Sequence, residues 1–139
     1  EEEFSTLDHE RRMYFLAEKK GMVVGFIRLW NSPHIKEWVV DGVVVHPLHR
    51  QKGVGCRLLE CAIEKALTAG ASSVVAHLSD TNAPTIRLHE KVGFERETAE
   101  YLNSFGNPRK NKRGWQWRLR FGKGHNQRVH GKATASRDP

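Results

Sequence analysis

The chain has 139 residues, 38% of them apolar, which suits one domain with a modest hydrophobic core. No apolar run approaches the roughly 20 residues that a membrane-spanning helix needs, and the acidic start lacks the pattern of a signal peptide. The two cysteines, Cys56 and Cys61, fall in one predicted helix, which excludes a disulfide between distant segments and gives no zinc-site spacing. We therefore expect a soluble, cytoplasmic protein without a metal site.

The net charge of +7 is unevenly distributed along the chain. Residues 109–139 hold ten of the 23 Lys and Arg residues and one of the 16 acidic residues, so this end carries +9 and the first 108 residues carry −2. Such a segment can bind nucleic acid, a membrane surface or another acidic partner, but its composition is also typical of disorder. We expect residues 123–139 to be a basic, disordered tail and nucleic acid or a membrane not to be a partner.

The first half of the chain reads as three strands. Residues 12–18 and 22–30 are apolar, aromatic-rich runs separated by Lys19, Lys20 and Gly21, which predicts an antiparallel hairpin with glycine at the turn. Residues 37–45 form a third predicted strand, and its many valines favour a central position covered on both faces.

The second half alternates helices and strands. Gly70 is the stop signal of the first helix, a strand follows at 73–78, and Asn82 begins a second helix that ends at Gly93. Phe94 leads into a strand, and residues 115–121 alternate as the last one. The order predicts an α/β fold with a mixed sheet flanked by helices. The apolar residues of the first helix recur at helical spacing, namely Val54, Leu58, Leu59, Ala62, Ile63, Ala66 and Leu67.

A glycine-containing loop, residues 50–55 with the sequence RQKGVG, lies between the third strand and the first helix. Gly53 and Gly55 lack a Cβ where a ligand would approach the main chain, and the amides that begin the helix can bind an anion. A dinucleotide fingerprint would need a third glycine where Leu58 stands, and the Gly-Lys-Ser/Thr ending of a Walker loop is absent. The loop therefore indicates a phosphate site of another kind.

Two motifs at a characteristic spacing give the chain a family resemblance. The loop has the form RxxGxG and follows Val45, His46 and Pro47, and further on come Asn82, Ala83 and the run LHEKVGF at 88–94. The chain thus resembles the GNAT acetyltransferases over about residues 13–121. The resemblance implies the GNAT acyl-CoA N-acyltransferase fold over residues 1–122. The family's opening strand and two helices would be shortened to the end of one helix at residues 3–11.

The resemblance also implies how acetyl-CoA binds as the acyl donor. The end of the third strand should part from its neighbour so that its main chain pairs with the pantetheine arm, with the Val45 amide donating to the thioester oxygen. The amides after Arg50 should hold the pyrophosphate, and Asn82 should hydrogen-bond the arm, although a helix cap alone explains that asparagine. The implied coenzyme-binding residues are Val43, Val44, Val45, Arg50, Gln51, Lys52, Gly53, Val54, Gly55, Cys56 and Asn82.

Two residues are candidates for proton transfer. Asp41 stands where many small-amine members of the family carry an acidic residue, and it could accept the proton of the amine directly or through water; a solvated aspartate is the alternative, and Glu37 is a weaker rival. His89 replaces the tyrosine of the family's LYxKxGF run, which is implicated in protonating the coenzyme sulfur. A histidine can donate a proton as well, but a lone helical histidine is more often structural.

The sequence thus predicts an acetyl-CoA-dependent N-acetyltransferase whose primary-amine acceptor attacks the thioester directly. Cys56 and Cys61 have no evident base partner, which argues against a covalent intermediate. The alternative is a catalytically weak CoA-binding module whose basic tail binds an acidic macromolecule. The partners are then acetyl-CoA and an amine acceptor, and a homodimer stays open.

Overall fold

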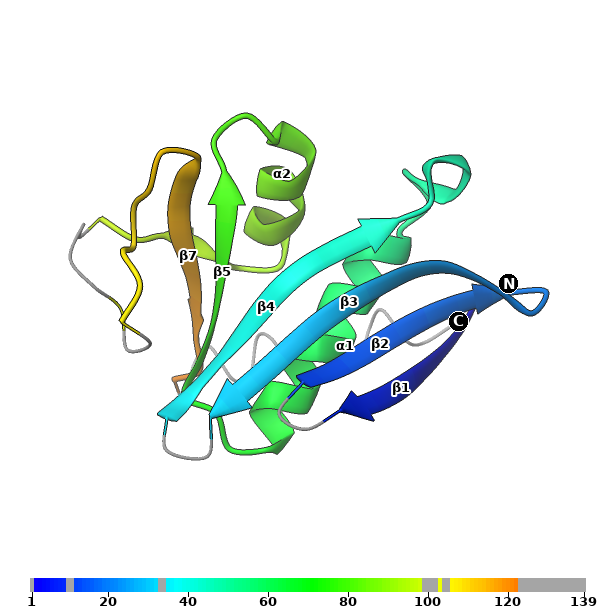
Figure 1. Ribbon diagram of the computed structural model, residues 1–139, viewed down its shortest axis with the longest axis horizontal. Coiled ribbons are helices and arrows are strands. Elements are labelled where there is room, and N and C mark those ends of the chain that lie inside the picture. Colours follow the sequence, from blue (N-terminus) through cyan, green and yellow to red (C-terminus); the bar gives the residue numbers. More distant parts are fainter. Residues whose placement is uncertain (1, 10–11, 33–34, 99–102, 104–105, 123–139) are drawn as a thin grey trace.

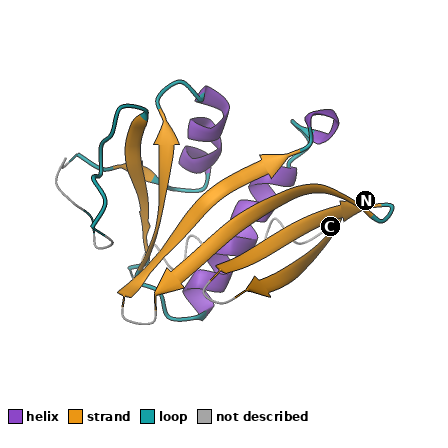
Figure 2. Cartoon of the chain, viewed as in Figure 1, coloured by secondary structure: helices purple, strands orange, loops and turns teal. Residues whose placement is uncertain are grey.

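The computed structural model describes residues 2–9, 12–32, 35–98, 103 and 106–122, so the expected tail at 123–139 lies outside the described residues. The described residues form one seven-stranded sheet with the strand order β1-β2-β3-β4-β5-β7-β6 and two α-helices (Figures 1 and 2). This is the mixed sheet flanked by helices that the element order predicts. No helix within the described ranges is both long and apolar enough to cross a membrane.

Four antiparallel strands make up the first half of the sheet. They are β1 (Glu3–His9), β2 (Arg12–Lys19), β3 (Met22–Ser32) and β4 (Ile35–Val45). The predicted hairpin of β2 and β3 is confirmed, and its turn places Lys20 and Gly21 at positive φ.

The expectation of a helix end at residues 3–11 is wrong. Residues 3–9 form β1, which pairs with β2 in a register that aligns Phe4 with Ala17. Without β1, the outer edge of β2 would present unpaired backbone groups, and pairing satisfies them. The Phe4 side chain also packs against the core, so the segment gains both hydrogen bonds and apolar contact.

The second half of the chain completes the sheet with two helices. Its elements are α1 (Val54–Thr68), β5 (Ser73–Ser79), α2 (Ala83–Lys91), β6 (Glu95–Arg96) and β7 (Gly114–Arg120). As expected, β5 lies parallel to β4, a connection that needs a crossover such as α1. Figure 1 shows α1 passing behind β2, β3 and β4, and its buried face is the predicted apolar one apart from Leu67, which is half-buried. We call the surface of β2–β4 on the side away from α1 the outer face.

Strands β4 and β5 stay together for only part of their length. Their pairing runs from Glu37 with Ser73 to Val40 with Ala76. Beyond that point β4 remains paired with β3 as far as Val45, while β5 remains paired with β7 as far as Ser79. The two strands therefore diverge toward their C-terminal ends, as Figure 1 shows, and leave a gap between their backbones.

A group of charged side chains lies at the end where β4 and β5 are still paired, which we call the closed end of the gap. Arg118 on β7 contacts Glu37 on β4 at 3.1 Å, the Ser73 hydroxyl on β5 at 2.8 Å, and Glu97, which follows β6. Burial alone would raise the pKa of Glu97, but the hydrogen bond and positive charge of Arg118 lower it. Because Glu37 is buried against Arg118 at the end of the strand away from Val45, it is a structural group and a poor rival to Asp41.

Candidate active site

The start of α1 is built to leave its amides open. Gly53 is the N-cap residue and has φ 83°, a left-handed conformation that costs other residues about 1–2 kcal/mol. No side chain of the described residues caps this helix start, and no acidic residue lies in its first turn. Gln51, just before, also has a positive φ of 62°. This loop therefore presents main-chain donors and the positive end of the helix dipole.

The first turn of α1 meets both β4 and α2. A Cβ placed on Gly55 would lie 3.5 Å from Leu88 of α2, 3.6 Å from Val45 and 3.8 Å from Val43. A Cβ on Gly53 would meet nothing within 4 Å. The distances from Gly55 are ordinary van der Waals distances, so a small side chain would fit there, whereas the left-handed turn at Gly53 favours glycine.

The backbone of Val45 faces the gap. His46 donates its amide to Val24 of β3 at 2.8 Å, and in an antiparallel ladder the next residue along the strand points the other way. The Val45 carbonyl accepts a bond from Arg50 Nε at 3.0 Å, which places it on the side away from β3. Since the N–H and C=O of one strand residue point in the same direction, the Val45 amide also faces away from β3.

The neighbouring coenzyme candidates surround this point. Lys52 is exposed in the loop, and Val44 projects its side chain into solvent, with 47% of its surface exposed. Cys56 lies one turn into α1, where its thiol is 3.8 Å from Glu60. Asn82 caps α2 by accepting a bond from the Thr85 amide at 3.2 Å, so the capping role is realised. No group of His, Cys, Asp and Glu among the described residues could hold a metal ion.

Asp41 lies one residue beyond Val40, the last residue of β4 that pairs with β5, and it is on the outer face. Its carboxylate is 52% exposed and forms an ion pair with Arg28 of β3, at 3.1 Å from Nε. The same Nε lies 3.1 Å from the Asp41 carbonyl. Arg28 was not predicted from the sequence, although its alternation with Phe26 and Trp30 on a strand could have placed it on this face.

His89 is deeply buried in α2, with only 1% of its surface exposed. Its Nδ1 lies 2.8 Å from the Thr85 carbonyl, and its ring packs edge-on against Phe94 at 5.0 Å. A carbonyl can only accept, so Nδ1 carries the proton and the neutral ring has its lone pair on Nε2. Within the described structure, Nε2 is buried without a hydrogen-bond partner. Burial lowers the pKa of His89, against a smaller raising effect of the Thr85 bond.

Three comparisons with known proteins bear on this site. Residues 1–94 match the family model described as Acetyltransferase (GNAT) family. The chain is 37% identical over 82 residues to the L-methionine sulfoximine/L-methionine sulfone acetyltransferase of Salmonella typhimurium, and 33% identical over 82 residues to the L-amino acid N-acyltransferase MnaT of Escherichia coli. Each alignment covers 57% of this chain and 48% of the relative, so the chain spans about half the length of these relatives.

A solved acetyltransferase of Bacillus subtilis in complex with CoA superposes with a TM-score of 0.71 at 15% identity. The superposition covers 88% of this chain and 100% of that one, which shows a shared fold. The parted strands, the glycine-opened helix start and the family model agree. The chain belongs to the GNAT acetyltransferase family.

Proposed function

We propose that the protein transfers the acetyl group of acetyl-CoA to a primary amine. The observation that carries this proposal is the uncapped start of α1 beside a backbone amide, that of Val45, which faces the gap between β4 and β5. An anion site and a main-chain donor side by side at the open end of one gap suit a ligand that carries phosphate groups and a carbonyl group.

The coenzyme would lie along this gap. The amides of the loop at 50–56 bind the pyrophosphate, each favourable charge at the helix end contributing about 0.3–1 kcal/mol. The main chain of residues 43–45 pairs with the amides of the pantetheine arm, and Asn82 adds a side-chain bond. The Val45 amide donates to the thioester oxygen, where negative charge develops during attack.

Transfer then requires a neutral amine and a leaving thiolate. Asp41 accepts the ammonium proton directly or through water, and the nitrogen lone pair forms a bond to the thioester carbon. The C–S bond breaks, the sulfur leaves with the electron pair as coenzyme A thiolate, and the extra proton on the nitrogen of the new amide passes to the thiolate or to water. The His89 ring, neutral and protonated at Nδ1, presents an acceptor at Nε2. Donation of a proton to the sulfur by His89 therefore needs a second proton on the ring, which its burial disfavours.

The relatives support a small acceptor. Those from Salmonella typhimurium and Escherichia coli are named for amino acids and amino-acid analogues. The test is release of free thiol from acetyl-CoA with a panel of amino acids, polyamines, aminoglycosides and peptides. Turnover on at least one amine supports the proposal, whereas no binding of any CoA species overturns it.

A second candidate is a CoA-binding module with little turnover. The geometry of His89 favours it, because the family's tyrosine position is filled by a buried, neutral ring. Tight CoA binding with no turnover on any amine would support the module. Replacement of His89 by Tyr distinguishes the two, since it should raise turnover only if the native residue limits the departure of the sulfur.

A further inference from the structure

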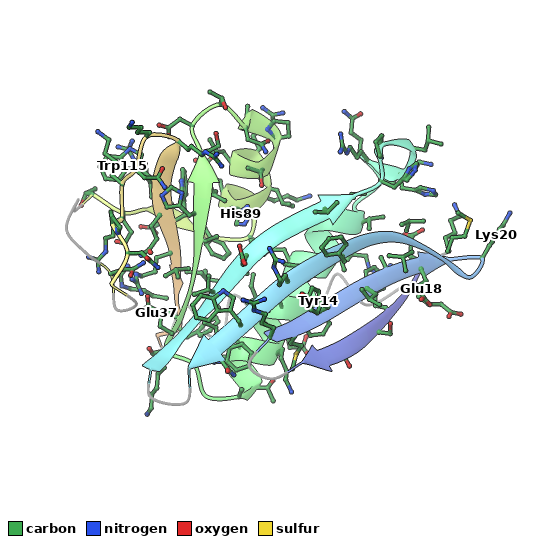
Figure 3. All side chains as sticks on the ribbon, in the orientation of Figure 1. Tyr14, Glu18, Lys20, Glu37, His89 and Trp115 are labelled. Atoms are coloured by element: carbon green, nitrogen blue, oxygen red, sulfur yellow. The ribbon has the colours of Figure 1, made fainter. Side chains whose placement is uncertain are left out.

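The outer face carries an arginine among aromatic side chains. Tyr14 of β2 lies directly across from Arg28 in the β2–β3 register, and Phe26 and Trp30 lie two residues to either side of it on β3. The alternation of the strand places all of them opposite the buried Ile27 and Leu29. The Tyr14 and Phe26 rings are 6.4 Å apart, and Figure 3 labels Tyr14 on the face turned to the viewer, with α1 behind.

Arg28 retains binding capacity in this arrangement. Both of its contacts, with the Asp41 carboxylate and the Asp41 carbonyl, use Nε. Among the described residues, its two terminal nitrogens therefore remain for a ligand, and a guanidinium can bind a carboxylate through two parallel bonds. The side chains of Arg28 and Asp41 are 38% and 52% exposed, so their ion pair contributes little to stability and can rearrange around a ligand.

The position of the pair relates it to the reaction. Asp41 follows directly after Val40, the last residue of β4 paired with β5, so Arg28 and Asp41 border the start of the gap. Helix α1 occupies the opposite face, so among the described residues the outer face is the side open to an acceptor. One positive and one negative group side by side match a molecule with an ammonium and a carboxylate group.

We propose that Arg28 binds the carboxylate of the acceptor and that the acceptor is an amino acid with an apolar side chain. This inference rests on the proposed acetyl transfer. The ammonium group faces Asp41, the carboxylate binds the terminal nitrogens of Arg28, and the side chain packs on the aromatic group formed by Tyr14, Phe26 and Trp30. An amine without a carboxylate lacks the Arg28 contact.

The test uses matched acceptors that differ only in the carboxylate. L-methionine is compared with 3-(methylthio)propylamine and L-phenylalanine with 2-phenylethylamine, for the wild type, for Arg28→Gln and for a control, Arg120→Gln. Arg120 is exposed on β7, beyond β5 from this pair. We expect the wild type and the control to prefer both amino acids, and Arg28→Gln to lower kcat/KM on them about tenfold or more, mainly through KM. Its loss of kcat/KM on the two amines should be clearly smaller, because they lack the carboxylate contact and are affected only by the loss of the Arg28–Asp41 ion pair.

The outcomes separate this inference from the proposed function. Equal kcat/KM on amino acids and amines, or an equal loss on both in Arg28→Gln, overturns the role of Arg28 while acetyl transfer stands. Lack of turnover on every amine overturns both. Circular dichroism and CoA affinity of Arg28→Gln should match the wild type, which excludes a folding defect as the cause.

Discussion

Replacement of Gly53 by aspartate tests the anion site directly. An aspartate at an N-cap position places its carboxylate over the amides of the first turn, about 6 Å from a phosphate bound there. At an effective dielectric constant between about 80 and about 20, the repulsion of two unit charges at this distance is about 0.7–3 kcal/mol. We therefore expect Gly53→Asp to weaken CoA binding by about threefold to about 100-fold.

Gly53→Asn is the matched control. A side chain at this position meets nothing within 4 Å of its Cβ, and asparagine tolerates the left-handed conformation better than most residues. It has the size of aspartate without the charge. Isothermal titration with CoA measures both variants, and thermal unfolding confirms that they fold. If Gly53→Asp binds CoA as tightly as Gly53→Asn, the pyrophosphate does not lie at the start of α1.

Three further variants test the proposed base, the buried histidine and the ion pairs at the closed end of the gap. Asp41→Asn should lower kcat by about 10²–10⁴-fold and leave CoA affinity unchanged, measured by thiol release and titration; an unchanged kcat would exclude Asp41 as the base. The pKa of His89 is lowered in the folded protein, so below about pH 6.5 its ring binds a proton in the unfolded chain but not in the folded one. The free energy of unfolding therefore decreases as the pH falls below this value. The melting temperature should therefore drop more between about pH 7.5 and about pH 5.5 in the wild type than in His89→Gln, and equal drops would contradict this. Arg118→Met leaves Glu37 buried without the cation of this ion pair, whereas Glu97 keeps Arg109 at 3.8 Å, so urea unfolding should show a loss of about 3–5 kcal/mol that comes mainly from Glu37; a loss below about 1 kcal/mol would mean that Glu37 finds another partner.

Local patterns predicted most of the fold because they act over a few residues. The structure confirms the turn at Gly21, the apolar face of α1 and the Asn82 cap. Each of these depends on residues that are close together in the sequence. Strand β1 was mistaken for a helix end because its preference depends on the edge of β2, which is a tertiary feature.

The site could be predicted only in part. The loop around Gly53 and the end of β4 are contiguous in sequence, so motif and structure agree on where they lie. The pair of Arg28 and Asp41 depends on a β-bulge that shifts the register of β3 against β4; Gly42, at φ 108°, marks the bulge locally, but the residue that faces Asp41 across the strands is set by tertiary pairing. The burial of His89 depends on Phe94 and the packing of α2, so the run at 88–94 gave the position of the ring but not its environment.

If the acyl donor lies between β4 and β5 as proposed, the divergence of these strands would give it a structural role as well. In the described structure, β4 and β5 pair only between residues 37–40 and 73–76, and this pairing joins the two halves of the sheet. A ligand that carries amides and lies along residues 43–45 takes the place of a neighbouring strand there. It supplies hydrogen-bond partners for the β4 backbone where β5 no longer pairs with it. Binding of the acyl donor would therefore link the two halves of the sheet by hydrogen bonds. An acceptor would then bind to a more rigid sheet than that of the protein without donor.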